Sequence, residues 1–391
     1  MSNTYPQTRG CGEDWLSVGL NVAWDRGKLS WQSVSKRLQM GRRAAESFGA
    51  PERLEVYGLD VEIQAGGVRP GGRRGQYFGV RLRYRNVFFA FVESGEYAGT
   101  GYNVWCEVSS LECVAVGGME GLREIYREVI AAWSGEIERE RMRRVDLRVD
   151  LTGIRVSDFI AAFDCGDVVT RFKRDQYARW GAPGAETSLY LGKSPLQLRI
   201  YNKSEEMRVK GQAGLLEYMQ RCVWKSGEET VTRVEFECLR SWLRERCGID
   251  SVDDYLAGRR DLVERLAVAQ VRFVTSDGRV QAWDRPMSTA WVEVHGALVR
   301  FAGEPGRESG QRARLGAAGV DGTRYWRQAL PMMMSAAVYE TGDEIANIVQ
   351  FFEYVADSMN AHCSGGEFER WLDEARKRVF GGKLEIVKGG N

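Results

Sequence analysis

Residues 143–151 read RRVDLRVDL, and the strict alternation of charged and apolar side chains in this stretch decides the fold class. Successive side chains of a β-strand point to opposite faces of a sheet. The valines and leucines therefore share one face, and the opposite face carries Arg144, Asp146, Arg148 and Asp150. This alternation is typical of an antiparallel sheet with one face packed on a core. We expect a sheet whose second face is lined with charged side chains.

Two further segments show the same alternation, LQLRIYNK at residues 196–203 and VTRVEFECL at residues 231–239. Their polar faces carry Arg199, Tyr201 and Lys203 in the first segment, and Arg233, Glu235 and Glu237 in the second. Cross-strand ion pairs on an exposed sheet would explain any one of these strands. Taken together, the three strands predict one site that combines acids from two strands with a tyrosine flanked by cations from the third.

Period-two patterns also dominate from residue 14 to about residue 111, which predicts further strands joined by Gly-containing turns. An apolar i, i+3, i+4 stripe after Val116 predicts a helix, and Ser157 is the expected N-cap of a short helix that ends near residue 164. Helical spacing dominates after residue 241, including residues 251–273. The expected fold class is α+β, an antiparallel sheet-based catalytic region followed by a mostly helical C-terminal region.

Changes in composition divide the chain into four expected parts. Residues 12–245 hold the predicted strands of the site, and residues 246–300 would complete this region with helices. Residues 301–322 are Gly-rich and polar, which is typical of a flexible linker or loop. Residues 323–391 return to helical spacing and form the expected helical C-terminal region.

The composition of the 391-residue chain, 43% hydrophobic and 28% charged, is close to globular averages and argues against wholesale disorder. No apolar run is long enough to cross a bilayer, and the first 15 residues lack the layout of a secretory signal. We therefore expect a cytoplasmic protein with no membrane partner. The eight cysteines form no CxxC pair and only His295 and His362 could complete a mixed site, so we expect no structural zinc.

Six arginines and no acid lie within residues 69–85, RPGGRRGQYFGVRLRYR, although the net charge of the chain is only +1. The alternation of the last three arginines predicts that they share one face of a strand. One interpretation is a ribbon that binds DNA phosphates, and the other is a solvated strand face beside a hairpin. On the first interpretation the DNA-binding residues are Arg73, Arg74, Arg81, Arg83 and Arg85.

Tyr201 is the candidate nucleophile of the predicted site. A tyrosine phenol has a pKa of about 10, so an attacking phenolate needs stabilisation at neutral pH. We expect Lys203 and Arg199 to lower the pKa of this phenol or to neutralise charge on the attacked phosphorus. Tyr190 is the rival nucleophile, but no cation flanks it along its own segment, so we expect it to serve packing.

The acids of the site suggest a divalent cation. Carboxylate oxygens favour hard ions such as Mg²⁺ or Mn²⁺, which would polarise a scissile phosphate and orient it for in-line attack. Because the chain has only two histidines, an all-oxygen site is the one that it can readily assemble. The candidate metal ligands are Asp146, Asp150, Glu235 and Glu237.

The order and spacing of these motifs resemble the replication initiation factor (Rep_trans) family, which includes initiators of rolling-circle plasmids and relaxases of integrative conjugative elements. The family pattern is an R-x-D-h-x-x-D strand, a G-x-T-h-Y-h-G-x-x-x-S segment running into R-h-Y-x-K-x-x-E, and an R-h-E-h-E strand. The matching segments are residues 144–150, 188–194, 199–206 and 233–237. The resemblance spans about residues 12–300; residues 185–188 blur the Gly-Thr lead-in, and the serine segment is one residue shorter than the commonest spacing.

The resemblance implies sequence-specific nicking and rejoining of DNA, to start rolling-circle replication or the transfer of a mobile element. Residues 12–245 would be the catalytic domain of a replication initiator or relaxase. Tyr201 would become joined to the 5′ phosphate of the nicked strand, with Arg199, Lys203 and Glu206 as the other catalytic residues. The four acids would be metal ligands or structural acids. The implied partners are origin DNA with a single-stranded nick region, a second copy of the chain in a homodimer, and a host helicase.

Other classes of protein remain as alternatives. A non-catalytic protein of the same fold that binds origin or single-stranded DNA would keep the arginines while its tyrosine and acids decayed, and here those residues are intact. A metal nuclease that uses water would need the carboxylates but not Tyr201. The chain lacks the His-x-x-Arg element of a tyrosine recombinase and the His-x-His element of a histidine-paired relaxase.

Overall fold

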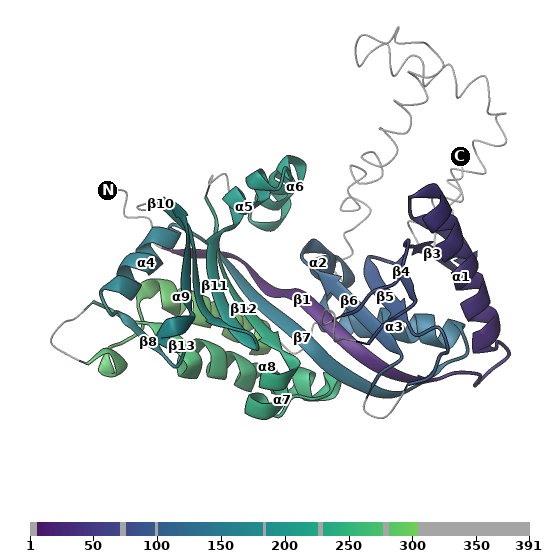
Figure 1. Cartoon of the computed structure of the whole chain (residues 1–391). Helices are drawn as coiled ribbons and strands as arrows, with labels where there is room; N and C mark the ends of the chain where they lie inside the picture. The colour runs from purple at the N-terminus through teal and green to yellow at the C-terminus, as the bar shows by residue number, and fades with distance from the viewer. Residues whose placement is uncertain are drawn as a thin grey trace, which may run out of the picture. The chain divides into compact units, whose positions relative to one another are not determined.

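An antiparallel sheet of eleven strands is the framework of the described residues in the computed structural model (Figure 1). The structure describes residues 6–70, 76–97, 101–182, 185–225, 230–276 and 281–303. From one edge to the other, the strands are β2 (Glu52–Val56), β3 (Leu59–Ile63), β4 (Val80–Tyr84), β5 (Val87–Phe91), β6 (Val104–Ser109), β1 (Gln7–Ala23), β7 (Glu136–Thr152), β12 (Thr232–Leu239), β11 (Leu196–Asn202), β10 (Ala185–Lys193) and β9 (Tyr177–Ala182).

The two longest strands join the halves of this sheet. β1 and β7 have 17 residues each and pair from Gln7 opposite Thr152 to Ala23 opposite Glu136. Their register shifts at several places, including Glu13/Trp15, and such bulges increase the local twist of a sheet. β12, β11, β10 and β9 continue the sheet from β7, while β6 and the hairpins before it continue it from β1.

One face of the sheet packs against the main hydrophobic core. The helices that pack in this core include α1 (Trp31–Phe48), α3 (Gly118–Ala132), α4 (Val156–Asp164), α7 (Arg240–Cys247), α8 (Val252–Glu264) and α9 (Thr289–Gly303). Their buried side chains form a single hydrophobic cluster with the apolar residues of the strands. Trp291 of α9, for example, packs against Phe236 of β12 with ring centroids 6.3 Å apart. The alternation of the strands is thus explained by this one-sided burial.

The opposite face is covered only in part. At the end near β11 and β12 it carries α5 (Lys203–Val209), α6 (Ala213–Tyr218) and a π-helical turn, η3 (Met219–Val223), around a small apolar cluster that includes Trp224. Figure 1 shows α5 and α6 on one side of the sheet and α7, α8 and α9 on the other. A second small cluster, Phe78, Ala90 and Tyr102, lies near β5. We call this second side of the sheet the polar face.

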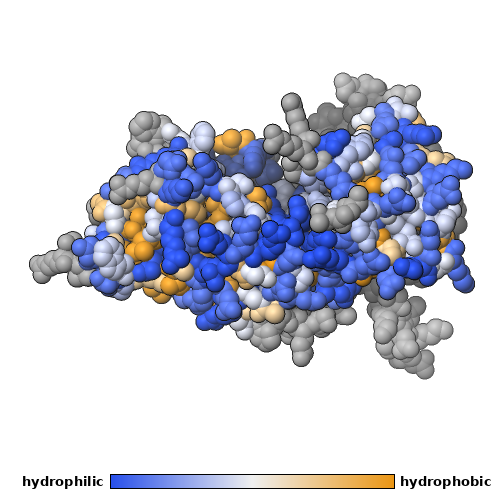
Figure 2. Space-filling model, turned by 60° about the horizontal axis from the view of Figure 1, so that its bottom comes forward, coloured by the Kyte–Doolittle hydropathy of each residue, from blue (hydrophilic) through white to orange (hydrophobic). Residues whose placement is uncertain are grey.

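Short elements complete the described chain. α2 (Leu111–Val116) follows β6, and β8 (Val168–Thr170) pairs with β13 (Val271–Phe273) in a separate two-stranded sheet. The turns η2 (Arg174–Gln176), η4 (Arg265–Gln270) and η5 (Ala282–Asp284) connect these parts. Hydrophilic residues dominate the side of the molecule in Figure 2, with hydrophobic residues scattered among them. No helix among the described residues is both long and apolar enough to span a membrane.

The α+β class with a large antiparallel sheet is confirmed, and several local predictions are wrong. The sequence pattern predicts strands over residues 31–48, but these residues form the helix α1. Trp31, Val34 and Leu38, which recur at helical spacing, are buried along its inner face. Ser157 lies inside α4, whose N-cap is Arg155. Residues 271–273 leave the predicted helix and form β13, because Val271 and Phe273 are buried in the core.

The predicted linker and the predicted C-terminal region lie at the C-terminal end of the described residues or outside them. The expected linker at 301–322 begins inside α9, whose last residue is Gly303. The rest of that segment and the predicted helical region 323–391 lie outside the described residues.

Candidate active site

The register of three neighbouring strands brings the predicted site residues onto one surface. Tyr201 on β11 lies opposite Arg233 on β12, and Arg233 lies opposite Asp150 on β7. The next row on the same face is Arg199, Glu235 and Arg148, and the one after it is Gln197, Glu237 and Asp146. Residues directly opposite in an antiparallel pair point to the same face. The three polar strands recognised in the sequence therefore form one continuous patch on the polar face.

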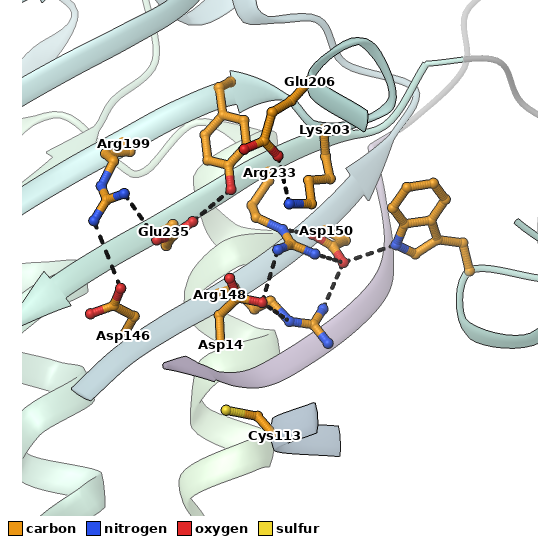
Figure 3. A network of polar contacts seen from close by, with 12 residues as sticks. Asp14, Cys113, Asp146, Arg148, Asp150, Arg199, Lys203, Glu206, Arg233 and Glu235 are labelled. Atoms are coloured by element: carbon orange, nitrogen blue, oxygen red, sulfur yellow. Dashed lines mark hydrogen bonds and ion pairs between the residues drawn. The ribbon is translucent and has the colours of Figure 1, made fainter. Parts of the chain in front are cut away.

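A buried network of ion pairs lies at the centre of this patch (Figure 3). Arg233 Nε lies 2.6 Å from Asp150 Oδ1 and its Nη1 lies 2.9 Å from Asp14 Oδ1. Arg148 bridges the same two acids, at 2.6 Å from Asp150 Oδ2 and 3.1 Å from Asp14 Oδ1. Trp224 Nε1 donates to Asp150 Oδ2 at 2.9 Å. Two arginines thus balance two aspartates inside the protein.

The charge on Asp150 is stabilised by this network. Burial alone would raise the pKa of its carboxyl, but Arg233, Arg148 and the hydrogen bonds outweigh burial and lower the pKa to about 2. Asp150 is fully buried, and both of its oxygens already accept from arginine or tryptophan donors. We therefore correct the prediction that Asp150 is a metal ligand and interpret it as a structural anion.

Tyr201 lies next to this network and donates a hydrogen bond from its hydroxyl to Glu235 Oε2 at 2.7 Å. The side chain is only 8% exposed. Burial and the nearby Glu235 raise the pKa of its phenol well above the ordinary value, whereas Arg233 acts in the opposite direction. The prediction that flanking cations would lower this pKa is wrong, because burial and an acid act more strongly on the phenol.

The predicted flanking cations are bound to acids instead. Lys203 Nζ lies 2.5 Å from Glu206 Oε2, and 5.7 Å from the centroid of the Tyr201 ring. Glu206 also accepts from Lys210, and these two lysines outweigh burial to lower the pKa of the Glu206 carboxyl. Lys203 is buried and Glu206 is partly exposed, and the two form an ion pair beside Tyr201, at the start of α5.

Arg199 is surrounded by three acids. Its guanidinium group forms ion pairs with Glu237, with Glu235 at 3.5 Å and with Asp146 at 3.7 Å. Arg144 binds two of the same acids, with its Nε 2.8 Å from Asp146 and its Nη2 3.0 Å from Glu237. Burial raises the pKa of the Asp146 carboxyl to about 7, with Glu235 acting in the same direction and Arg144 opposing it.

These contacts decide whether the predicted acids fit a divalent cation. In the described ranges, no group of three or more histidine, cysteine, aspartate and glutamate side chains is arranged to hold a metal ion. Asp146, Glu235 and Glu237 converge, but on the guanidinium group of Arg199 rather than on an open ligand position. The arrangement does not fit Mg²⁺ or Mn²⁺ at the four predicted acids.

Tyr190, the rival candidate nucleophile, has a cation as its neighbour on the adjacent strand. It lies opposite Arg199 across β10 and β11, on the polar face. Its side chain is half-buried, and the hydroxyl of Tyr201 is the one bonded to a carboxylate. The neighbour across the sheet could not be read from the segment alone.

The arginines of the predicted DNA-binding ribbon, within residues 69–85, do not all share one face of a strand. Arg81 and Arg83 lie on β4, on the face opposite the buried Leu82, and both stack on the ring of Phe88 at 4.8 and 4.4 Å. Arg83 also pairs with Glu112 at 3.4 Å. The strand ends before Arg85, which has φ 44° in the hairpin turn and pairs with Glu128 of α3 at 2.8 Å. The prediction that Arg85 shares their face is therefore wrong, and Arg73 and Arg74 lie outside the described residues.

Two members of the central network were not predicted as site residues. Asp14 lies at a register shift of β1, between Glu13 and Trp15, and Trp224 follows η3, so both lie outside the three polar strands. The position of Asp14 has no period-two signal, since the bulge at Glu13/Trp15 breaks the alternation. Only the tertiary structure brings these residues to Asp150.

Comparisons with known proteins add a likeness in overall structure. No protein-family model matches the chain, and no curated protein matches it. A solved structure described as the rolling circle replication initiator protein from Geobacillus stearothermophilus is similar, with 16% sequence identity and a TM-score of 0.42. The match covers 76% of this chain and 97% of that one.

The central network predicts a specific effect on stability. Asp150→Asn should lower the free energy of unfolding by about 3–5 kcal/mol near neutral pH, because two buried arginines lose their shared anion. Since the folded pKa of about 2 lies below the unfolded value, the contribution of Asp150 is present above about pH 4 and is lost as the pH falls through about 2.

Urea unfolding of wild type and Asp150→Asn between about pH 7 and pH 2 measures this effect, and the difference should shrink toward acid. Asp253→Asn is the control, because its carboxylate is 75% exposed in an ion pair with Arg123 and should matter by less than about 1 kcal/mol. A pH-independent difference for Asp150→Asn would contradict the assignment of Asp150 as the stabilised anion.

Proposed function

We propose that this protein nicks and rejoins one strand of DNA through Tyr201, as an initiator of rolling-circle replication or of mobile-element transfer. The observation that carries the proposal is the hydrogen bond from the Tyr201 hydroxyl to Glu235 on a sheet face that also holds Arg199. A hydroxyl, a carboxylate that can take its proton and a cation for the phosphate are the groups that phosphodiester transfer to tyrosine needs. The motif order described above adds to this support.

Glu235 is the proposed proton acceptor. Because the pKa of Tyr201 is raised well above its ordinary value, almost no phenolate exists at neutral pH, and the proton must leave during attack. Glu235 Oε2 already accepts that proton in a hydrogen bond of 2.7 Å. The phenolic oxygen would bond to phosphorus as its proton passes to Glu235, while the bond from phosphorus to the 3′ oxygen breaks and that oxygen takes a proton from water, which leaves a 5′ phosphotyrosine and a free 3′ hydroxyl. Rejoining reverses these steps.

Arg199 and Lys203 are the proposed phosphate contacts. Both are now paired with carboxylates, Arg199 with Glu237 and Glu235, and Lys203 with Glu206. At each of these two cations, a phosphoryl oxygen of bound DNA would take the place of a carboxylate oxygen. The cation would therefore stay paired with an anion. Glu206 would then act by holding Lys203 beside Tyr201, at the start of α5. The DNA partner would be an origin with a single-stranded nick region.

One observation favours a second function. Tyr201 is only 8% exposed, so a scissile phosphate can reach its hydroxyl only after the surrounding side chains move. A protein of the same fold that binds origin or single-stranded DNA without cutting it needs no such movement. A covalent protein–DNA adduct distinguishes the two functions directly.

Tyr201→Phe should abolish this adduct while leaving DNA binding nearly unchanged, because only one hydroxyl is removed. The measurement is a denaturing gel of protein incubated with supercoiled or single-stranded DNA, with Mn²⁺, with Mg²⁺ and with EDTA in parallel. Tyr190→Phe is the matched control, since it removes a hydroxyl from the same face, opposite Arg199, and should keep the adduct. An active Tyr201→Phe together with an inactive Tyr190→Phe would reverse the assignment.

Glu235→Gln should slow adduct formation by about 10²-fold or more, because glutamine accepts the hydrogen bond but cannot take the proton. Single-turnover formation of the adduct measures this rate. A Glu235→Gln variant with the wild-type rate would show that the residue has no part in proton transfer.

The arginines of β4 are proposed to grip DNA phosphates. Arg81→Ala/Arg83→Ala should lower the slope of log affinity against log salt by about two, roughly one for each lost contact, and should weaken binding to every DNA alike. A salt titration by fluorescence anisotropy measures the slope. Arg85→Ala is the control, since this residue lies in the hairpin turn beyond the end of β4 and its side chain pairs with Glu128 on the side of α3. Equal slopes for all three proteins would make the ribbon a solvated strand face.

A further inference from the structure

One cross-strand row of the sheet leads from Tyr201 to the open edge strand. Tyr201 on β11 lies opposite Ser188 on β10, and Ser188 lies opposite Trp180 on β9. These three residues therefore share the polar face. Adjacent strands lie about 4.8 Å apart, so the backbone of Trp180 is roughly 10 Å from that of Tyr201. Only the small side chain of Ser188 stands between the indole and the tyrosine in this row.

The Trp180 side chain is 60% exposed, which is unusual for the largest apolar side chain. Its neighbours show that it does not belong to the core. Arg179 lies opposite the buried Leu189, on the core face, where it pairs with Asp164 of α4. Trp180 therefore points to the other face. The next residue of β9 on that face is Ala178, which is too small to cover an indole.

The surroundings of Trp180 favour an aromatic ligand with a polar edge over an apolar protein surface. The row continues through the hydroxyl of Ser188, and Tyr190 lies one step along β10 on the same face. Among the described residues, the neighbours of this indole on the sheet face are small or polar, so it offers one flat ring rather than a contiguous apolar patch. Cations also precede the strand, since Arg171 and Lys173 are exposed just before η2.

We propose that Trp180 is a stacking platform for a nucleobase of single-stranded DNA, one or two nucleotides from the phosphate that Tyr201 attacks. This inference rests on the proposed function. Stacking on an aromatic ring tolerates any base, so Trp180 would hold the strand without reading its sequence. With the base fixed at β9, the backbone of the strand crosses Ser188 toward the row of Tyr201. Trp180 is then a binding and positioning residue rather than a catalytic one.

The test compares four full-length proteins in binding to a fluorescein-labelled thymidine oligonucleotide of roughly 20 nucleotides, longer than a single-stranded site of about 4–16 nucleotides. They are wild type, Trp180→Ala, Trp180→Phe and Trp283→Ala. Trp283 on η5 is the matched control, because its side chain is 62% exposed and it lies outside the eleven-stranded sheet. Thermal unfolding of each protein checks that the exposed substitutions leave the fold intact.

Trp180→Ala should weaken binding about tenfold or more, Trp180→Phe should retain most of the affinity, and Trp283→Ala should match wild type. An oligonucleotide with abasic sites should bind wild type as weakly as Trp180→Ala binds the intact one. If wild type binds DNA and forms the adduct while Trp180→Ala binds equally well, the stacking inference is wrong and the proposed function stands. If wild type binds no DNA, both are wrong.

Discussion

The ion pair between Arg233 and Asp150 is the interaction on which the rest of the site depends. It lies inside the protein, where an unpaired charge is costly, so β12 and β7 are held in the one register that joins these two residues. Arg148 and Asp14 extend the constraint to β1. A slip of one residue would turn each of these charges into the core. The network therefore fixes where β11, the next strand, presents Tyr201.

The same principle explains the resting state of the candidate nucleophile. Each cation near Tyr201 is balanced by a carboxylate, and the phenol is kept neutral by burial and by Glu235. Under the proposed function, a site neutralised in this way would keep its tyrosine unreactive until the scissile phosphate competes for Arg199 or Lys203. Binding and activation would then be coupled, because the phosphate would take the place of Glu235 at Arg199 and leave that carboxylate to accept the proton.

The two faces of the sheet have different roles, because one packs in the hydrophobic core and the other carries the polar side chains. Apolar residues of every long strand pack against α3, α8 and α9 in one cluster, so the polar face is free to vary in charge. Along that face the side chains change from the arginines of β4 to the ion-paired patch and then to the exposed indole of Trp180. Under the proposed function, a single strand of DNA lying across the strands would meet each of these groups in turn.

Alternation in the sequence was sufficient to assign the α+β class and the polar faces of three strands, because the period of two reports burial on one side directly. The helix α1 was missed, since its few buried residues lie among many polar ones and the segment resembles its strand-rich neighbours. The sequence also identified Tyr201, Glu235 and Arg199 as residues of one surface, which the strand register bears out geometrically.

Only the tertiary structure decided the chemical state of those residues. A pKa depends on burial and on neighbours across the sheet, and neither can be read along one strand. Flanking cations in the sequence suggested an activated phenol. In the structure, Lys203 pairs with Glu206 and the Tyr201 phenol donates a hydrogen bond to Glu235. Asp150 looked like a metal ligand until Trp224, from a distant turn, was seen to complete its hydrogen bonds. Residue types follow from the sequence, but which charge meets which partner is settled by packing.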